Sequence, residues 1–590
     1  MAWLARVERR RAGRRGAVLA VVLQLSAAAR AAYFVELSAS PYVAQHRWDQ
    51  TDMSFFDEWG ARLAAGDWLG RAALHPRHAW QLEQARAELA ARPALAEALG
   101  AKPGEPPESA APALVDRWYG GATYHQEPLY PWLVGLTYAA AGRDVRHVFA
   151  WQLLVGVLAN ALVWLAARRA FGDLAAAVAA FLAVLCGTLL YFEMQLLRES
   201  LLVAASLLLA FWLAAPPRGA RGEVALGAAA ALAFLLKTSL ALWLLPALAL
   251  RALADRRGAR QALARAAATA LGAVIVLAPV VARNVAVGAP ALALSGVGAM
   301  TFVNANAEDF PGDVGAFVSR HAGRIVTDAD GRLLPSAVAA LRTHPGAASY
   351  LGQLGRKLAA VFHWYEIPNN ANFYAYRAAA PILALPVTFL VVAPPGLVGL
   401  VLALRHRPAW PLALVAAGNV AAMLVFYPLS RFRAPLLAAL IPFAAFALVS
   451  VVRLAASGRR AAAVAAVLAT ALLGAWVGRP LPAGRSLLRA SDCQVPFALV
   501  YGPRYRAAAE AGRWSEAAGV ALRALEREPE AVRSLRPGVL AATEDDRGCA
   551  RAYAEFYGLA ADALAAAGEP RAAALARRRA DELAAAASPR

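Results

Sequence analysis

Runs of apolar residues, separated by short basic turns, make up most of the chain as far as residue 480. A helix that crosses a bilayer needs about 20 apolar residues, because each residue adds only about 1.5 Å of length. The pattern therefore predicts about eleven spans, over residues 16–35, 147–167, 174–190, 201–214, 224–236, 240–250, 264–281, 379–404, 410–426, 436–452 and 461–477. The apolar run at 128–142 is too short to cross, and we expect it to be half inserted.

Most of the basic residues lie in short clusters between these runs, as the positive-inside rule requires of cytoplasmic turns. The first run lacks a small-residue cleavage site, so it is interpreted as an anchor that follows a cytoplasmic N-terminus at 1–15. An odd number of spans that starts inside ends outside. We therefore expect external segments at 36–127 and 282–377, within a transmembrane domain at 16–480, and an external tail at 481–590. Helical spacing within 80–100 indicates an amphipathic helix along the membrane surface.

Composition places the chain among integral membrane proteins. It has 590 residues, 60% of them apolar and 17% charged, whereas soluble domains have about 25% charged residues. The mean hydropathy is +0.46. A net charge of +20 would suggest nucleic-acid binding in a soluble protein, but the clustering of the basic residues between spans argues against it here. No Ser-His-Asp set or phosphate-binding glycine loop is recognisable, so nucleotide-driven chemistry is not expected.

The tail departs from this composition and carries charged, alanine-rich helical segments. Small and apolar residues recur at Ala511, Trp514, Ala518 and Leu525 with helical spacing, which resembles one unit of a tetratricopeptide repeat. One unit does not suffice for an independent array, so the tail is either a small helical cap on the external loops or a docking module.

Two of the three cysteines, Cys493 and Cys549, lie in this tail, and Cys186 lies within a predicted span. An external tail would be in an oxidising compartment, so we predict that the two tail cysteines form a disulfide. The alternative is that one or both are buried apolar residues. A disulfide between them would stabilise the tail by about 3 to 4 kcal/mol on the loop-entropy model.

The first external segment begins with acidic residues that are costly beside a membrane unless they have a function. Helical spacing from Asp52 places Phe55, Phe56 and Trp59 on one apolar face. The simplest interpretation is a solvated amphipathic helix with an acidic N-terminus.

Several motifs resemble those of bacterial membrane glycosyltransferases related to the protein O-mannosyltransferases and to the lipid A aminoarabinose transferase. In chain order they are TDMSFFDEWGARLAAGDW, YHQEPLYPWLVGLTYAAAG, APVVARNVAVGAP, RKLAAVFHWYEIPNNANF and FYPLSRFRAPLLAALIPF. The resemblance runs through residues 16–477. It implies the GT-C fold, an all-α polytopic architecture with external amphipathic helices, and transfer of a sugar from a polyprenyl phosphate on the outer side of the membrane.

Such transfer needs a base for the acceptor hydroxyl and positive charge for the leaving phosphate. By resemblance to the first-loop aspartate of the family, Asp52 is expected to be the general base, with inversion at the sugar carbon; Asp49 and Asp57 remain alternatives. Three arginines at external span ends are expected to bind phosphate, the alternative being lipid head groups, namely Arg283, Arg431 and Arg433. Lys237 is a weaker candidate of the same kind.

Further polar residues in the motifs are expected to bind substrate. Glu199 occupies the place of a second acidic residue in the family, although an ion pair with its neighbour Arg198 is an alternative. The others are His125, Glu127, Arg198, Glu366 and Asn370. Some relatives have a lysine before the proline that follows Glu127, so a phosphate role for that motif is doubtful. His125 and Glu127 can orient the donor or bind a divalent ion; no cofactor is certain.

The sequence thus predicts a hexosyl- or pentosyltransferase of the bacterial inner membrane, with its active site and tail on the periplasmic side. Its partners would be a lipid-linked sugar, membrane lipids, an envelope acceptor (lipid, glycan or protein) and a protein bound to the tail. Two alternatives remain: a non-catalytic scaffold that presents the tail, and a transporter. A transporter should carry internal repeats and charged or broken helices at mid-membrane, whereas the acidic residues here cluster in loops.

Overall fold

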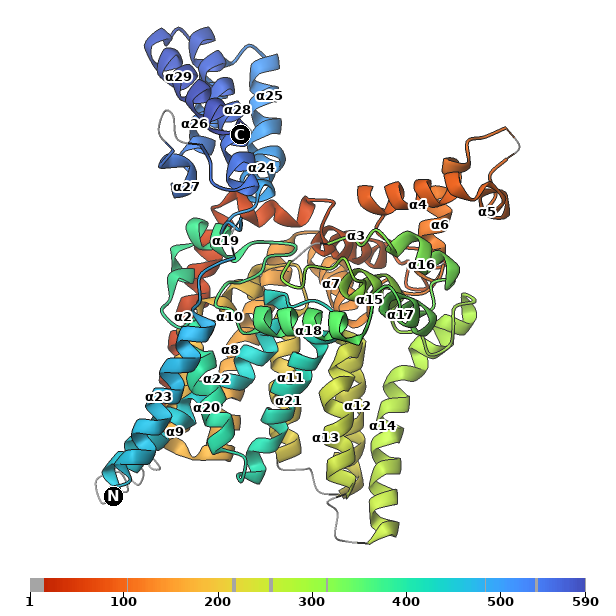
Figure 1. Cartoon of the computed structure of the whole chain (residues 1–590), viewed down its shortest axis with the longest axis vertical. Helices are drawn as coiled ribbons and strands as arrows, with labels where there is room; N and C mark the ends of the chain where they lie inside the picture. Colours follow the sequence, from red (N-terminus) through yellow and green to blue (C-terminus); the bar gives the residue numbers. More distant parts are fainter. Residues whose placement is uncertain are drawn as a thin grey trace. The chain divides into compact units, whose positions relative to one another are not determined.

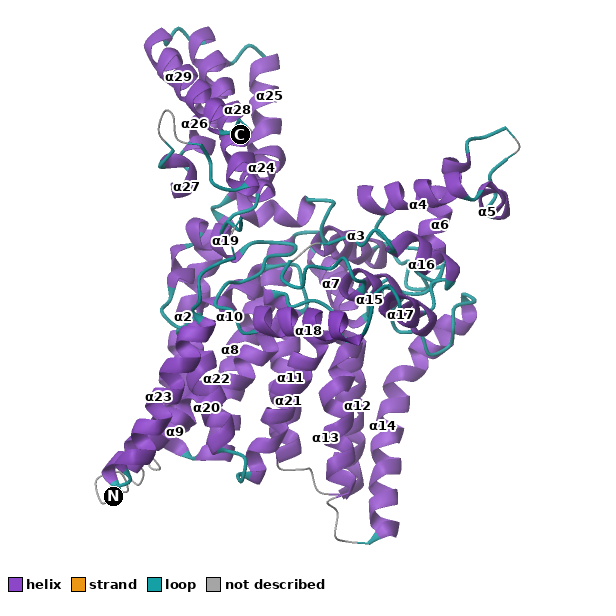
Figure 2. Ribbon diagram, viewed as in Figure 1, coloured by secondary structure: helices purple, strands orange, loops and turns teal. Residues whose placement is uncertain are grey.

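The computed structural model describes residues 15–102, 104–214, 219–253, 258–314, 317–482, 484–535 and 540–588. Within these ranges the chain is helical, with one isolated bridge between Cys186 and Val387 and no strand (Figure 2). Two compact units are present. The first comprises residues 1–29, 55–369 and 385–478, and the second comprises residues 30–54, 370–384 and 479–590. The chain passes between the units within α2 (Arg15–Ser38) and within α3 (Asp52–Ala64).

The first unit contains the long apolar helices and the helices that connect them (Figure 1). After α3 they are α4 (Ala79–Ala91), α5 (Pro93–Ala98), η2 (Pro107–Ala110), α6 (Ala111–Trp118), α7 (Leu129–Ala141), α8 (Val145–Phe171), α9 (Asp173–Val184), α10 (Gly187–Tyr191), η3 (Phe192–Met194), α11 (Glu199–Ala214), α12 (Gly219–Leu236), η4 (Thr238–Leu240), α13 (Ala241–Leu253), α14 (Ala259–Ala286), α15 (Gly298–Asn306), α16 (Ala322–Asp328), α17 (Leu333–Leu341), α18 (Ala347–Val361), α20 (Phe389–Leu402), η6 (Arg407–Ala409), α21 (Trp410–Val425), α22 (Ser430–Ala456) and α23 (Arg460–Val477).

The helices agree with a polytopic membrane protein. In the described part of the chain, seven helical segments are long and apolar enough to cross a membrane, and four apolar helices are shorter. Each of these elements coincides with one of the expected spans. The all-helical, multi-pass architecture is therefore confirmed, while the number of helices that cross the membrane stays a prediction.

Two spans end at different residues from those expected. The helix expected at 174–190 stops at Val184, because the backbone turns extended at Cys186 and Leu185 accepts a hydrogen bond from Val387. The helix expected at 379–404 begins only at Phe389. Proline has no N–H to donate and disfavours helical geometry in the residue before it. Pro381 therefore starts a separate short helix, and Ala380 before it is extended.

Glycines allow two of the long helices, α12 and α14, to approach closely. A Cβ added to Gly227 of α12 would overlap the carbonyl oxygen of Thr269, and one added to Gly272 of α14 would overlap the carbonyl oxygen of Val224. Small residues at facing positions are a common way to pack helices in lipid. The other side of α14 exposes large apolar side chains such as Val274 and Ile275, as expected of a lipid-facing surface.

The loop helices α4 to α6 and α15 to α17 share a small hydrophobic core, which confirms the helical part of the segment at 80–100. Leu89, Trp118, Val303 and Val326 are buried in it. Trp118 Nε1 also donates to Thr327 Oγ1 at 2.8 Å. The loop with α4 to α6 and the loop with α15 to α17 therefore pack together and share one core.

Helix α18 lies crosswise to the long helices (Figure 1) and buries a lysine. Lys357 is fully buried, and its Nζ donates to Asn306 Oδ1 and to the Leu424 carbonyl oxygen, each at 2.9 Å. Neither acceptor is charged. Burial lowers the pKa of Lys357 to about 7, because an ammonium group is poorly solvated there.

This lysine predicts a pH dependence of stability. The pKa is about 7 in the folded chain and near its ordinary value of 10.5 in the unfolded chain, so the unfolded chain binds one more proton between these values. Stability should therefore rise as the pH increases from about 7 towards 10.5. We expect Lys357→Met to flatten this rise in thermal unfolding of the detergent-solubilised protein, and Arg356→Met on the same helix to retain it. Equal slopes in wild type and Lys357→Met would contradict the prediction.

The second unit brings together three parts of the chain that are distant in sequence. Its helices, besides the ends of α2 and α3, are η1 (Pro41–Arg47), α19 (Phe373–Ala379), η5 (Pro381–Ala384), α24 (Ala490–Pro496), the π-helix η7 (Phe497–Tyr501), α25 (Gly502–Glu510), α26 (Trp514–Leu525), α27 (Glu530–Arg533), α28 (Glu544–Ala566) and α29 (Pro570–Ala586). The unit includes the predicted tail at 481–590 together with residues 30–54 and 370–384.

The tail core is built of small residues and a disulfide. Cys493 of α24 and Cys549 of α28 are bonded, with their Cα atoms 5.4 Å apart, which confirms the predicted pairing. The bond closes a loop across 56 positions. On the loop-entropy model, such a closure stabilises the folded tail by about 4 kcal/mol. Alanines such as Ala517, Ala521 and Ala560 pack around it.

Candidate functional site

Asp52 and Asn370 form a reciprocal pair in the second unit. Asp52 is the first residue of α3, and its backbone N–H donates to Asn370 Oδ1 at 3.1 Å. In return, Asn370 Nδ2 donates to Asp52 Oδ2 at 3.0 Å. The carboxylate is partly exposed, and the N-terminus of a helix favours negative charge. An acceptor hydroxyl can therefore approach a carboxylate that a hydrogen bond from Asn370 orients.

The two alternatives to Asp52 have different surroundings. Asp57 accepts hydrogen bonds from Tyr138 at 2.6 Å and from Arg143 at 2.5 Å, so it joins α3 to the helices that follow. Asp49 is exposed in the turn before α3. Of the three aspartates, Asp52 combines access with a fixed orientation.

Glu127 and Arg198 form a buried ion pair in the first unit. Arg198 Nη1 donates to Glu127 Oε2 at 2.5 Å and to the Leu236 carbonyl oxygen at 2.9 Å. Thr238 donates to the other oxygen of Glu127 through both its N–H and its hydroxyl, each at 2.7 Å. Burial by itself raises the pKa of Glu127, but Arg198 and Thr238 outweigh burial, so its pKa is lowered and the carboxylate stays charged.

This ion pair bears on the alternative interpretation of Glu199, which was an ion pair with its neighbour Arg198. Arg198 pairs with Glu127, which is 71 positions away, and not with its neighbour Glu199. Glu199 is the first residue of α11 and is buried, and its Oε2 has no hydrogen-bond partner among the described residues. Its negative charge acts on Lys237 instead.

Lys237 and Arg431 share the ring of Phe432. Lys237 Nζ lies 3.3 Å from the ring centroid and Arg431 Cζ lies 4.7 Å from it. Burial lowers the pKa of Lys237, and the nearby charges of Arg198 and Arg431 lower it further against the opposing effect of Glu199. Adding an anion would relieve the repulsion among these cations, so the cluster is suited to phosphate.

Arg433 has a different environment from Arg431, although only one residue separates them. It is buried and pairs with Glu366 at 2.6 Å. Its guanidinium also donates to the carbonyl oxygens of Val361 at 3.2 Å, His363 and Tyr365 at 3.1 Å. These bonds hold the loop after α18 against α22. Burial raises the pKa of Glu366, and Arg433 opposes this change.

Arg283 is likewise engaged by the protein. It donates to the carbonyl oxygens of Leu69, Gly70 and Ala122 at 2.7 to 2.8 Å, and it stacks 4.0 Å from the ring centroid of Tyr124. Together with His125, it lines a small pocket that is partly open to solvent. His125 Nδ1 is 3.3 Å from His75 Nδ1 in this region.

The predicted site residues therefore fall into groups. Asp52 lies with Asn370; Glu127 lies with Arg198; Glu366 lies with Arg433. Glu199 and Arg431 meet through Lys237, while Arg283 and His125 line a separate pocket in the same unit.

A family model describing dolichyl-phosphate-mannose-protein mannosyltransferases matches residues 125–283. The matched segment starts at His125 and ends at Arg283, so it covers nearly all of the motif at 124–142 and the first half of the motif at 278–290. Residues 125–283 of this chain are therefore similar to that family of membrane glycosyltransferases. Over this segment the match agrees with the resemblance seen in the sequence. No protein with a curated description matches the chain.

Solved structures show a weaker similarity to this chain. ArnT from Cupriavidus metallidurans in the apo state is 16% identical, with a TM-score of 0.34, over 86% of this chain and 69% of that one. The same protein bound to undecaprenyl phosphate is 15% identical, with a TM-score of 0.33, over 89% and 75%. The Archaeoglobus fulgidus oligosaccharyltransferase in complex with Zn and sulfate is 20% identical, with a TM-score of 0.31, over 62% and 46%. The chain thus spans about half the length of that oligosaccharyltransferase.

The sequence allows a divalent metal ion at His125 and Glu127. Among the residues that the structure describes, no group of three or more His, Cys, Asp or Glu side chains is arranged to hold a metal ion. His125 and Glu127, the two residues suggested as ligands, have His75 and Arg198 as partners respectively.

Two contributors to the candidate site were not expected from the sequence. Thr238 donates two hydrogen bonds to Glu127. The ring of Phe432 makes cation–π contacts with both Lys237 and Arg431. A signal for each was present: the Lys-Thr pair interrupts a long apolar run, and Phe432 lies between two arginines.

Proposed function

We propose that this chain is an inverting glycosyltransferase that moves a hexose or pentose from a polyprenyl phosphate to an envelope acceptor. The cation cluster of Lys237 and Arg431 on Phe432 is the observation that carries the proposal. The description of the family whose model matches residues 125–283 names a sugar donor linked to a lipid phosphate. A cluster of cations at the ends of apolar helices is suited to the phosphate of such a donor.

In the proposed reaction, Asp52 accepts the proton of the acceptor hydroxyl. The hydroxyl oxygen then forms a bond to the anomeric carbon of the sugar, and the bond from that carbon to the phosphate oxygen breaks. The leaving phosphate keeps the bonding electrons, and Lys237 and Arg431 stabilise its charge. A single displacement of this kind inverts the configuration at the anomeric carbon. The two roles belong to different units, and each rests on contacts within its own unit.

Comparing envelopes tests this function directly. Mass spectrometry of glycans, glycolipids and glycoproteins from cells with and without the protein should reveal one sugar modification that requires it. Cells that express Asp52→Asn at the same level serve as the control and should lack the same modification. An identical set of envelope sugars in both strains would favour the scaffold or the transporter instead.

We also propose that the active site and the tail face the periplasm of a bacterial inner membrane. The disulfide between Cys493 and Cys549 supports this side, because disulfides persist in oxidising compartments.

Labelling of intact spheroplasts checks the side of the membrane. A membrane-impermeant maleimide should label Cys493 and Cys549 only after reduction. Cys186, the other cysteine of the chain, is buried and provides a background that a Cys186→Ser variant removes. Labelling that appears only after lysis, without any reductant, would place the tail in the cytoplasm.

A further inference from the structure

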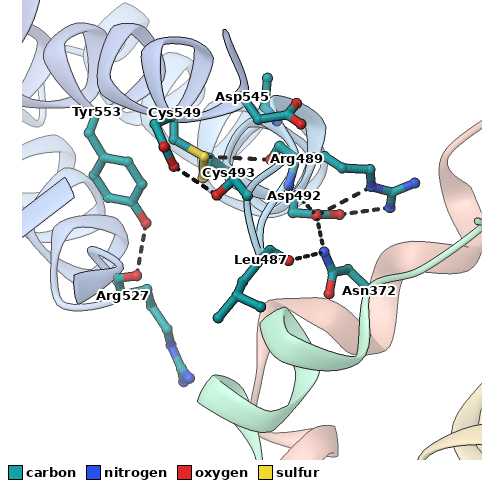
Figure 3. The surroundings of a disulfide bond; sticks show 12 residues. Asn372, Leu487, Arg489, Asp492, Cys493, Arg527, Asp545, Cys549 and Tyr553 are labelled. Atoms are coloured by element: carbon teal, nitrogen blue, oxygen red, sulfur yellow. Dashed lines mark hydrogen bonds and ion pairs between the residues drawn. A yellow bond between two sulfur atoms is a disulfide. The ribbon is translucent and has the colours of Figure 1, made fainter. Parts of the chain in front are cut away.

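The tail is attached to the loop that carries Asn370 through one buried side chain, that of Asn372. Asn372 Nδ2 donates to Asp492 Oδ2 at 2.6 Å and to the Leu487 carbonyl oxygen at 2.9 Å (Figure 3). Its Oδ1 accepts a hydrogen bond from the N–H of Tyr374 at 2.8 Å and so caps α19. Asn372 therefore joins the loop to the tail and to α19 at once.

Asp492 is itself held firmly. Arg489 donates to it through its guanidinium and through its backbone N–H, each at 2.8 Å (Figure 3). The next residue, Cys493, is bonded to Cys549 of α28. On the same α24, the N–H of Ala490 donates to Asp545 Oδ1 at 3.2 Å. The carboxylate that accepts the hydrogen bond from Asn372 is thus fixed by its ion pair with Arg489 and by the neighbouring disulfide bond.

Asn370 is only two residues before Asn372, and it holds the carboxylate of Asp52. Gln45 of η1 additionally donates to the Asn370 carbonyl oxygen at 3.4 Å. Two residues of chain span at most about 7 Å. A displacement of Asn372 is therefore passed on to Asn370, because the short connection can absorb little of it. All of these residues belong to the second unit.

The charge of Asp492 argues against a contact that only packs the tail against the loop. Asp492 and Asn372 are both almost completely buried. Burying an ion pair carries a desolvation cost that a well-packed apolar contact avoids, whereas hydrogen bonds to a charged group fix direction as well as distance. A misplacement of about 1 Å at a catalytic group can lower a rate about 100-fold. A directional link at this point is therefore of use to catalysis.

We propose that Asp492 of the tail is a positioning residue for Asp52. It holds Asn372, and through the loop it sets the position of Asn370 and of the catalytic carboxylate. The C-terminal tail is then a structural part of the active site. This inference rests on the proposed function, and in particular on Asp52 as the base.

The test replaces Asp492 with Asn, which keeps the shape but places a donor against the donors of Asn372 and Arg489. Membrane vesicles that contain the full chain and native acceptors are supplied with polyprenyl-phosphate-linked mannose labelled in the sugar. We expect kcat to fall about 10- to 100-fold and the KM for the donor to stay unchanged. The acid limb of the pH profile of kcat should move to higher pH, because the Asp52 carboxylate loses a hydrogen bond that stabilises its charged form. A role in folding alone would lower the amount of active protein without moving this limb.

A second variant cuts the same link from the loop side. Asn372→Ser retains a hydroxyl that can cap α19 but is too short to reach Asp492. It should reproduce the loss of kcat and the pH shift, and the double variant should lose no more than either single variant. The matched control is Asp545→Asn, which alters the other carboxylate contact of α24 and should leave kcat and its pH profile unchanged.

The outcomes separate the two hypotheses. Wild-type kcat and pH profile in Asn372→Ser, or in a folded Asp492→Asn variant, would overturn the positioning role. Losses that add in the double variant would also overturn it. Asp52→Asn is measured in parallel: if it is inactive while the Asp492 variant is unimpaired, the positioning role alone fails. If Asp52→Asn is itself active, the proposed base fails and the positioning role fails with it.

Discussion

Replacing Asp52 with Asn should lower the rate of sugar transfer by about 100- to 10,000-fold, the range that a positioned general base contributes. The change retains the size of the side chain and an oxygen that can accept from the helix N-terminus, but it removes the group that accepts a proton. We expect the protein to insert and fold normally, because the carboxylate is partly exposed. The measurement is transfer of labelled mannose from polyprenyl phosphate in membrane vesicles, alongside the amount of folded protein in the membrane.

Two matched variants accompany this measurement. Asp49→Asn alters an exposed aspartate just before α3 and should retain activity. Asp57→Asn weakens the ion pair with Arg143 and should affect stability more than the pH dependence of transfer. Full activity in Asp52→Asn would remove the general base from the proposed mechanism. Loss of activity in Asp49→Asn alone would transfer that role to Asp49.

Removing the cations on Phe432 should weaken binding of the lipid phosphate by about 10- to 100-fold for each group. A hydrogen bond to a charged group contributes about 1.5 to 3 kcal/mol, and every 1.4 kcal/mol changes a dissociation constant tenfold. The variants are Lys237→Met and Arg431→Ala, and the probe is undecaprenyl phosphate, titrated into protein held in lipid nanodiscs. Arg377→Ala is the control, because Arg377 also lies over aromatic rings, those of Phe373 and Tyr374, but is exposed. Unchanged affinity in both variants would overturn the phosphate assignment.

The pH dependence of this binding gives a further check on Lys237. Its pKa is lowered by burial and by Arg198 and Arg431, so it loses its proton at a lower pH than an ordinary lysine. Only the protonated form attracts phosphate. Affinity for undecaprenyl phosphate should therefore fall as the pH rises through this lowered pKa, and Lys237→Met should abolish that dependence.

Arg433 provides the contrast within the same motif. Its partners are Glu366 and three backbone carbonyl oxygens, so its removal leaves a buried carboxylate without its counter-ion. Breaking such a pair costs about 3 to 5 kcal/mol. Arg433→Ala should accordingly lower the folding yield, whereas Arg431→Ala should lower donor affinity in a stable protein.

The sequence by itself determined the class of protein and the course of its helices. Apolar runs of sufficient length can satisfy their backbone groups in lipid only as helices, so runs such as 147–167 and 461–477 predict spans directly. The start of α3 at Asp52 was also predictable, because helical spacing and an acidic first residue are local signals. The two tail cysteines were paired from their compartment and their number.

Only the tertiary structure decided which charged residues meet. An ion pair of Arg198 with its neighbour Glu199 was one interpretation of the sequence, but Arg198 pairs with Glu127, and Asp52 meets Asn370 from 318 positions away. Arg431 and Arg433 belong to one motif, yet a displacement of two positions along a helix turns a side chain by about 200°, so one reaches Phe432 and the other enters the loop after α18. Sequence patterns report the periodic burial of single elements. The partner of a buried charge is set by the packing of distant elements, because a charge in a low dielectric must find its counter-ion wherever the fold brings one.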